Sequence, residues 1–600
     1  MNVDTVYLDK ELVNNGSMYS YATQTVLLVA AYCDEVDLDL CLVTQESEDK
    51  PKITPGFKEP EKCFSNVTSK SIDEIPKQVA DCHLPVILMH NQTYVVSGLC
   101  HVIRQIIKLA CKKQDPSLKT LLGHKQCCLK ASSEVSSRTK LCEVTAPHVV
   151  DKWMELDSAS HAHKLPAAII ELESILKRPV VIHNMDKCQR VVLERINKHG
   201  SETQGEPPAK VIKHSSGKKV VKTQDLPPLQ HTFIEGVDFA LSDLALLPLV
   251  HNFLYFYLKI TDDLLEHVPL TIKWYHRLQS IPKLSTALRS CNVDFVSVKE
   301  SFNGKTPVFE DGKCQVLELG EKQQVQPNKK ALEKTLRRDL PVIIEKLNQH
   351  VDAKFKELNS TEIKIDWDLI PKDVHPTMGE LSTARAQRKC HQMENIIHAA
   401  KQICKNGDVI VDFCCGGGHV GILLSHFFPK CQIILIENKE ESLDRARARI
   451  ENLGATNITI YQCNLEHYRG KFDIGVALHA CGVATDMVLH ECMKRKSSFV
   501  ISPCCYGRIV NTDKITYPQS KFFKNIPTSF DEMLVLGRGG DQTSWNFENG
   551  KAKQGKHCMA IMDTDRINAA SDQGYKTELY SLQPQNCSPK NNLIVGVFIS

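Results

Sequence analysis

A glycine-rich segment in the C-terminal half has the residue types of a nucleotide-binding turn. The apolar residues Val409–Val411 precede it, and Gly416, Gly418 and Gly421 follow at the spacing Gly-x-Gly-x-x-Gly. Glycine suits such a turn because the backbone adopts unusual φ angles and a ligand approaches it closely. Dinucleotide enzymes and methyl-donor enzymes share this turn, so the spacing alone does not separate the two classes.

Three polar side chains stand where neighbouring strands are expected to end. Asp412 follows the first strand, and its negative charge would repel a pyrophosphate but suits a positively charged sulfonium ligand. Glu437 ends the next strand, about 20 residues beyond Gly416, where a carboxylate can accept both ribose hydroxyls. Asn464 follows the third strand, where its side chain can bond an adenine amine. Together these residues favour S-adenosylmethionine as the ligand.

His479 is the first candidate for acid–base chemistry. It follows the apolar segment 472–478, and an imidazole there could take a proton from a hydroxyl acceptor. The alternative is a supporting histidine that only hydrogen-bonds the loop. The Asn-Pro-Pro-aromatic motif of many N-methyltransferases is missing after this strand, which favours an oxygen or carbon acceptor.

The next apolar segment is followed by Cys504, Cys505 and Tyr506, which complete the set of candidate catalytic residues. A thiolate here could attack a cytosine ring as a nucleophile. Only Arg508 stands nearby in the sequence to lower a thiol pKa, so packing or shaping of the substrate pocket is the favoured role. Because the chain has no Cys-x-x-Cys and no zinc-type histidine spacing, we expect no metal site.

The elements that must position these residues are those of a parallel α/β sheet. From residue 381 onward, buried apolar segments alternate with helical patterns. Ligands of doubly wound sheets bind at the carboxyl ends of the strands. We therefore expect His479–Gly482 and Pro503–Tyr506 to line an acceptor pocket beside the methyl donor.

The ordered segments DFCCGGG, IILIE, QCN and FDIGVALHACG resemble class I S-adenosylmethionine-dependent methyltransferases. Phe472–Asp486 and Ser498–Arg508 are similar to RNA-directed methyltransferases in which His-x-Cys-Gly precedes a vicinal Cys-Cys. The resemblance implies a Rossmann-type domain, S-adenosyl-L-methionine as cofactor, and tRNA or another structured RNA as partner. It also implies that Arg385–Ile396, which contains Gln392, caps the cofactor pocket.

The N-terminal half contains a second resemblance. Residues 236–257 and 271–282 resemble the helical C-terminal domain of glutathione S-transferases. In that family a Ser/Thr-x-x-Asp capping box begins the central helix. This sequence keeps the acid, Asp243, but has Ala240 at the capping position. Such modules often dock other proteins, and the resemblance implies a protein partner here.

A thioredoxin-like domain is expected before this helical module. Leu84-Pro85 and the following hairpin are similar to its end, where the family has a cis proline. The family's glutathione anchors are replaced by Ser97-Gly98, and Tyr32 and Cys33 are interpreted as bystanders, so glutathione chemistry is not expected. Residues 25–43 are predicted to form a buried strand followed by a helix.

Six hundred residues exceed the size of one hydrophobic core, so the sequence predicts a multidomain α/β protein. The predicted parts are a degenerate thioredoxin-like domain over 1–130, an all-α domain of the glutathione S-transferase C-terminal type over 131–300 with a basic loop at 200–228, a connector over 301–380, and a Rossmann-type methyltransferase domain over 381–600.

Composition limits the class of protein and of partner. The 24 cysteines are scattered through apolar stretches, which is typical of buried thiols in a cytoplasmic protein. No apolar run reaches the roughly 18–20 residues that cross a bilayer, so no membrane partner is expected. The net charge is only +3, so any RNA surface must be a local patch.

The sequence thus favours a methyltransferase that acts on RNA. Basic residues that could contact RNA are Lys218, Lys219, Lys329, Lys330, Arg337 and Arg338. The alternatives are a glutathione-dependent transferase or reductase, and a non-catalytic scaffold protein.

Overall fold

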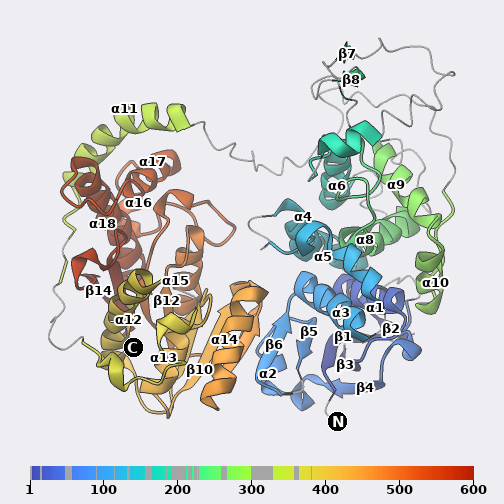
Figure 1. Ribbon diagram of the computed structural model, residues 1–600, viewed down its shortest axis with the longest axis horizontal. Helices are drawn as coiled ribbons and strands as arrows, with labels where there is room; N and C mark the ends of the chain where they lie inside the picture. The colour runs from blue at the N-terminus through green and yellow to red at the C-terminus, as the bar shows by residue number, and fades with distance from the viewer. Residues whose placement is uncertain are drawn as a thin grey trace. The chain divides into compact units, whose positions relative to one another are not determined.

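The structure is a computed structural model that divides into two compact units (Figure 1). The first unit comprises Met1–Val79, Leu84–His90 and Ser97–Leu319, and the second comprises Ala80–His83, Asn91–Val96 and Gly320–Ser600. The residues that the structure describes are 3–13, 16–46, 57–89, 91–113, 115–131, 136–155, 165–182, 185–191, 211–213, 219–221, 226, 229–257, 267–298, 329–353, 355–356, 364–379 and 382–599.

The first unit begins with a thioredoxin-like β/α arrangement. Its strands are β1 (Thr5–Val13), β2 (Gly16–Met18), β3 (Asp39–Glu46), β4 (Asn66–Ser71) and β5 (Val86–Leu88). β1 lies between β3, which is parallel to it, and β5, which is antiparallel. The Leu84–Pro85 peptide before β5 is cis, as the resemblance implied.

One prediction for this region is wrong. Residues 25–43 were expected to form a strand and then a helix, but helix α1 (Tyr21–Cys33) comes first and β3 follows. All but one residue of α1 are buried. A helix buried on every side lacks the polar face that produces a 3.6-residue period, so its apolar run is indistinguishable from a buried strand.

Helices complete the first unit. They are α2 (Lys77–Ala80), α3 (Leu99–Lys113), α4 (Ser137–Lys140), α5 (Ala146–Glu155), α6 (Ala167–Lys177), α8 (Leu241–Tyr257), α9 (Pro269–Gln279) and α10 (Pro282–Ser290). Two short antiparallel strands, β7 (Val211–Lys213) and β8 (Lys219–Val221), fall in the predicted basic loop. Most of that loop lies outside the described residues, as do residues 301–328, 354, 357–363 and 380 of the connector.

Asp243 organises the start of α8 through three hydrogen bonds. Its Oδ1 accepts from the Ile234 amide at 2.9 Å and from Trp274 Nε1 at 2.8 Å, and its Oδ2 accepts from the Ala240 amide at 2.8 Å. The carboxyl is fully buried, and burial raises its pKa to about 7 against the effect of these donors. The acid half of the capping box therefore persists without the hydroxyl half.

The second unit contains the sheet that positions the site. Its strands are β9 (Val409–Phe413), β10 (Gln432–Glu437), β11 (Ile458–Gln462), β12 (Ile474–Leu478), β13 (Ser498–Ser502), β14 (Tyr575–Ser581) and β15 (Asn592–Phe598). Their spatial order is β14-β15-β13-β12-β9-β10-β11, and β6 (Tyr94–Ser97) pairs in parallel beyond β11. β15 is antiparallel to both neighbours, whereas β9 to β13 are mutually parallel. The strand order reverses between β9 and β12, which is where doubly wound sheets bind ligands.

Helices of this unit flank the sheet (Figure 1). They are α11 (Lys329–Asn348), α12 (Thr383–Ile403), α13 (His419–Phe427), α14 (Glu440–Leu453), α15 (Val483–Arg495), α16 (Lys521–Lys524), α17 (Phe530–Gly540) and α18 (Gly550–Ser571). The two units confirm the predicted multidomain α/β class. Within the described part of the chain, no helix combines the length and apolarity needed to cross a bilayer.

Candidate active site

Asp412 lies beneath the glycine-rich turn and holds it to the sheet. Its Oδ2 accepts a hydrogen bond from the Gly421 amide at 2.8 Å, and its side chain is buried. Burial raises the pKa of Asp412 to about 7, while the Gly421 bond and the nearby Lys389 act in the opposite direction. A Cβ on Gly421 would stand 2.0 Å from Leu435 Cδ2, so glycine permits α13 to approach the strands closely. Asp412 therefore holds the glycine-rich turn against the sheet.

The turn itself leaves open space beside Glu437. Gly416 and Gly418 have left-handed backbones, with φ of 56° and 70°, and a Cβ on Gly416 would meet no atom within 4 Å. The Gly416 amide donates to Glu437 Oε2 at 3.0 Å. The other carboxylate oxygen accepts from the amides of Asn438 and Lys439, at 2.9 and 3.0 Å. These three donors fix a half-buried carboxylate at the end of β10.

Asn464 is joined to the same group through Asn438. The Asn438 Nδ2 donates to Asn464 Oδ1 at 3.3 Å. β10 and β11 are parallel, with Glu437 opposite Gln462, so the ends of both strands meet at one edge of the sheet. The structure therefore places Gly416, Glu437 and Asn464 together, as a nucleoside site requires.

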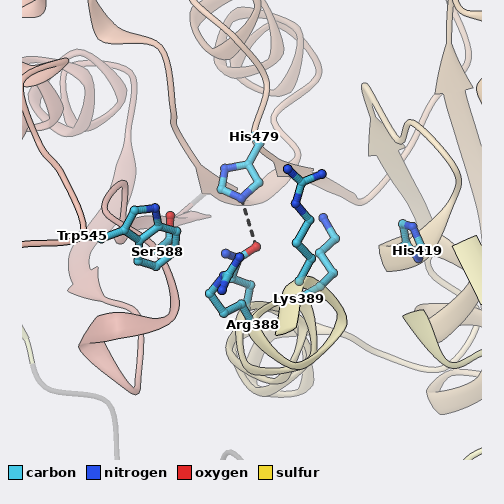
Figure 2. A pocket seen from close by; sticks show the side chains of 8 residues that line it. Arg388, Lys389, His419, His479, Trp545 and Ser588 are labelled. Atoms are coloured by element: carbon cyan, nitrogen blue, oxygen red, sulfur yellow. Dashed lines mark hydrogen bonds between the residues drawn. The ribbon is translucent and has the colours of Figure 1, made fainter. Parts of the chain in front are cut away.

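A pocket of about 350 Å³ lies beside the end of β12, and Gly416, Glu437 and Asn464 are not among the residues that line it. It is lined by Arg385, Arg388, Lys389, Gln392, His419, His479, Trp545 and Ser588. Figure 2 shows Trp545 and Ser588 on one side, His419 on the opposite side, and His479 between them. His419 directly follows Gly418, so the pocket extends from the glycine-rich turn to the end of β12.

Gln392 fixes the orientation and the proton position of His479. Gln392 Nε2 donates to the Cys587 carbonyl at 2.9 Å, so its Oε1 is the atom that lies 3.0 Å from His479 Nε2 (Figure 2). An amide oxygen only accepts, so His479 Nε2 carries the proton and Nδ1 keeps a lone pair. Burial, together with Lys389, lowers the pKa of His479 to about 4. The ring is therefore neutral near pH 7.

Positively charged side chains and the indole ring of Trp545 also line the pocket. The Arg388 guanidinium lies 4.7 Å from the centre of the Trp545 ring, whose side chain is 54% exposed. Burial lowers the pKa of Lys389 to about 8, and Asp412 opposes that shift. With Arg385, these side chains give the pocket a cationic wall suited to an anionic ligand.

Sequence reasoning missed this wall. Arg385, Arg388, Lys389 and Gln392 recur at three- and four-residue spacings on α12, which places them on one face of the helix. That signal was present in the segment expected to cap the cofactor pocket. Trp545 has no comparable signal, because it reaches the pocket only through the tertiary fold.

The candidate catalytic residues after β13, which are Cys504, Cys505 and Tyr506, are not among the residues that line this pocket. Tyr506 is buried, its hydroxyl donates to Asp563 Oδ2 at 2.8 Å, and it does not line the pocket. Cys504 is buried and Cys505 is half-buried, and both contact Cys481. Contacts with the other two thiols lower the pKa of Cys505, with help from nearby cations, and raise the pKa of Cys504.

The first unit shows no activated thiol at the position considered for glutathione chemistry. Cys33 is buried at the end of α1, and burial raises the pKa of its thiol to about 12. Burial also raises the pKa of the Tyr32 hydroxyl. Both groups are therefore protonated near neutral pH, unlike the thiolate or the activating hydroxyl of a transferase.

A family model described as a methyltransferase domain matches residues 388–512, which confirms the methyltransferase domain predicted from the sequence. The Glutathione S-transferase C-terminal domain-containing proteins of Mus musculus and Homo sapiens are each 36% identical to the chain, over 99% of its length and 98% of theirs. The Drosophila melanogaster homolog is 33% identical over 89% of the chain and 88% of its own length.

Solved structures similar to the chain include two methyltransferases. A putative S-adenosyl-L-methionine-dependent methyltransferase from Methanococcus maripaludis is 14% identical with a TM-score of 0.24, and covers 37% of this chain and 91% of its own. A putative methyltransferase from Streptococcus mutans in complex with SAH is 13% identical with a TM-score of 0.21, and covers 34% of this chain and 95% of its own.

Proposed function

Because the chain belongs to the family of Glutathione S-transferase C-terminal domain-containing proteins, and carries a methyltransferase domain, we propose that it is an S-adenosyl-L-methionine-dependent methyltransferase acting on RNA. One observation carries the proposal: a single pocket extends from the glycine-rich turn at His419 to His479 at the end of β12. A methyl donor on the turn and an acceptor near His479 would share this pocket.

The residues around the turn fit the cofactor. Glu437 keeps lone pairs for ribose hydroxyls beyond its three backbone contacts. The open space at Gly416 admits a ligand against the backbone, and Lys389 offers a cation for the carboxylate of the amino-acid tail. When bound, the cofactor supplies an electrophilic methyl group on a sulfonium centre.

His479 is suited to remove a proton from the acceptor. Its Nδ1 lone pair is available because Gln392 holds the proton on Nε2. The residue is held at its side chain by Gln392 and at its main chain by Ser502, since the His479 backbone amide donates to the Ser502 carbonyl at 3.0 Å. A fixed, neutral imidazole can accept the proton of a hydroxyl as the methyl group is transferred.

The pocket wall favours RNA as the acceptor. Arg385, Arg388 and Lys389 can contact phosphates, and the half-exposed Trp545 ring offers a face on which an unpaired base can stack. Single-stranded loops of structured RNA present both groups together. The patch is local, in keeping with a net charge of only +3.

Calorimetry with S-adenosylhomocysteine tests the cofactor. We expect the full chain to bind it, and Glu437→Ala to weaken binding by at least about tenfold, which corresponds to the loss of roughly one charge-assisted hydrogen bond. Glu451→Ala is the matched control, because that exposed glutamate lies at the far end of α14. Equal affinities for the wild type and Glu437→Ala would contradict the proposed site.

Transfer of labelled methyl groups tests the acceptor. Total RNA and tRNA from cells that lack the gene are incubated with the full chain and methyl-labelled cofactor, and the labelled nucleoside is identified by mass spectrometry. We expect label in RNA that His479→Ala does not produce. Label found only in protein or in small molecules, with normal cofactor binding, would overturn the RNA assignment.

A further inference from the structure

Three thiols converge at the carboxyl ends of β12 and β13. Cys481 Sγ lies 3.1 Å from Cys504 Sγ and 3.5 Å from Cys505 Sγ, and Cys504 Sγ lies 3.6 Å from Cys505 Sγ. We refer to these three residues as the thiol triad. No residue of the triad lines the pocket described above.

The fold brings the triad together through strand register. β12 and β13 are parallel neighbours, with Leu478 opposite Ser502, so the residues that follow each strand lie side by side. Gly482 then approaches the other loop closely: its φ is 60°, and a Cβ there would stand 2.5 Å from the Arg508 carbonyl oxygen. The two loops that carry the thiols are therefore packed against each other.

The spacing of the sulfur atoms matches one face of a metal tetrahedron. A Zn–S bond of about 2.3 Å in tetrahedral geometry separates the ligand sulfurs by about 3.8 Å. The triad has separations of 3.1 to 3.6 Å, which require only a small expansion. A disulfide would require about 2.05 Å. We propose that the thiol triad is a Zn²⁺ site in which Cys481, Cys504 and Cys505 supply three thiolate ligands.

The composition of the site argues for a thiophilic ion with one open position. Three thiolates favour Zn²⁺ over the oxygen-seeking Mg²⁺ and Ca²⁺. Cys481 is exposed, so an ion can enter from solvent. Among the described residues, no fourth histidine, cysteine or carboxylate lies within the 4.8 Å that encloses the triad. Three protein ligands and an exchangeable fourth are the pattern of zinc sites that bind a water molecule or substrate.

The triad also explains why sequence spacing excluded zinc. The ligands come from the loops that follow two strands, and the vicinal pair Cys504-Cys505 replaces the usual Cys-x-x-Cys. Parallel strands joined by a helix bring residues together that are far apart in the chain. The absence of Cys-x-x-Cys from the sequence therefore does not exclude a zinc site formed by these three cysteines.

Metal titration of the full chain tests the proposal. Protein stripped with a chelator is titrated with Zn²⁺ in competition with a chromophoric chelator, and with Co²⁺, whose thiolate charge-transfer and ligand-field bands report tetrahedral sulfur coordination. We expect Cys481→Ser and Cys505→Ser to weaken Zn²⁺ binding by at least about 100-fold, more than the loss of a supporting contact costs, and to abolish the Co²⁺–thiolate band.

Cys404→Ser is the matched control. Its Sγ lies 3.6 Å from Cys431 Sγ, so it removes a half-buried thiol from a pair rather than a triad. We expect this variant to bind Zn²⁺ and Co²⁺ as the wild type does. Circular dichroism of the metal-free proteins checks that all variants are folded, and Cys481→Ser is expected to fold because that residue is exposed.

Two results would overturn the zinc site. One is equal metal affinity and an equal Co²⁺ spectrum for the wild type and Cys481→Ser. The other is a Cys481–Cys504 disulfide in protein prepared without reductant, together with no metal binding after reduction. Calorimetry with S-adenosylhomocysteine on the same variants separates this outcome from failure of the cofactor site, since the triad and Glu437 do not share a contact.

Discussion

The side chain of His479 depends on the amide of Gln392 for its orientation. Gln392 itself is fixed by the Cys587 carbonyl, so a chain of two hydrogen bonds, at 2.9 and 3.0 Å, sets which ring nitrogen bears the proton. Such supporting contacts hold a catalytic group within the narrow range of positions at which proton transfer is efficient.

Replacement of His479 should separate catalysis from cofactor binding. We expect His479→Ala to lower turnover by about 100-fold or more, the usual effect of losing a general base, and to leave affinity for S-adenosylhomocysteine nearly unchanged. His426→Ala is the control, because that histidine is exposed on α13. Turnover of His479→Ala within a few-fold of the wild type would reduce this residue to a supporting role.

At the residue scale, the sequence predicted residues whose position at a strand end and whose chemical type both suit a ligand. Glu437, Asn464 and Gly416 were singled out by their places at strand ends, and the structure brings them together. The sequence did not predict the contact of Trp545 with Arg388 or that of Cys481 with Cys504, because only the tertiary fold brings these residues together. That these residues bind a cofactor remains a prediction.

The junction of β9 and α13 is closely packed at Gly421. A methyl group on Gly421 would stand 2.0 Å from Leu435 Cδ2, and Leu435 is fully buried, so its side chain would have to shift within the core. We expect Gly421→Ala to lower the free energy of unfolding by about 1–3 kcal/mol through overpacking. Urea unfolding followed by circular dichroism would measure the change.

Gly550→Ala provides the comparison for that variant. A Cβ on Gly550 would meet no atom within 4 Å at the start of α18. Alanine is the better helix former, so this change should be neutral or stabilise by up to about 1 kcal/mol. Equal destabilisation by both variants would show that close approach at Gly421 is unimportant.

Asp243 should make stability depend on pH in a defined window. Its pKa rises from 3.8 to about 7 on folding, so the native state binds more protons than the unfolded state between about pH 4 and pH 7. The free energy of unfolding contributed by this group therefore falls as pH rises through that window. Asp243→Asn removes this contribution and mismatches one of three donors, at a cost of about 1–3 kcal/mol.

The destabilisation caused by Asp243→Asn should thus be larger near pH 5 than near pH 8. Urea titrations at both pH values would measure it. Asp238→Asn serves as the control, since Asp238 is exposed just before α8. A difference between wild type and Asp243→Asn that grows toward pH 8 would contradict the assigned direction of the shift.

At the element scale, prediction succeeded where the hydrophobic period was clear. From α12 to β13 the buried strands follow helices largely as expected, because these strands are short apolar runs bounded by polar or glycine residues. The expected alternation is wrong beyond β13, where α16, α17 and α18 follow one another and β14 pairs antiparallel with β15. Prediction also failed at α1, which is buried on nearly all sides and gives no helical period. Its N-cap, Ser20, whose side chain accepts from the Thr23 amide, was the local signal that could have identified the helix.

Electrostatics of the whole chain should limit how it binds RNA. With a net charge of +3, non-specific attraction is weak, and the pocket cations should account for most of the salt dependence. We expect Arg388→Ala to reduce the slope of log affinity against log salt by about 1. Lys430→Ala should leave the slope unchanged, because Lys430 precedes β10 and lies at the opposite edge of the sheet.

Filter binding of a structured RNA at several salt concentrations would give these slopes. Equal slopes for Arg388→Ala and the wild type would mean that the RNA contacts lie elsewhere on the chain. The basic segment at 200–228, most of which lies outside the described residues, would then be the next region to test.

Two hydrogen bonds to the protein's own carboxylates fix the glycine-rich turn, because Asp412 accepts from the Gly421 amide and Glu437 accepts from the Gly416 amide. A loop in this state loses little conformational entropy when a small molecule docks on it. Association should therefore be a single fast step whose rate rises linearly with ligand concentration, without the plateau that a slow rearrangement imposes. The structure thus makes the turn a rigid receptor, and any slow step in the reaction cycle is expected to belong to the acceptor.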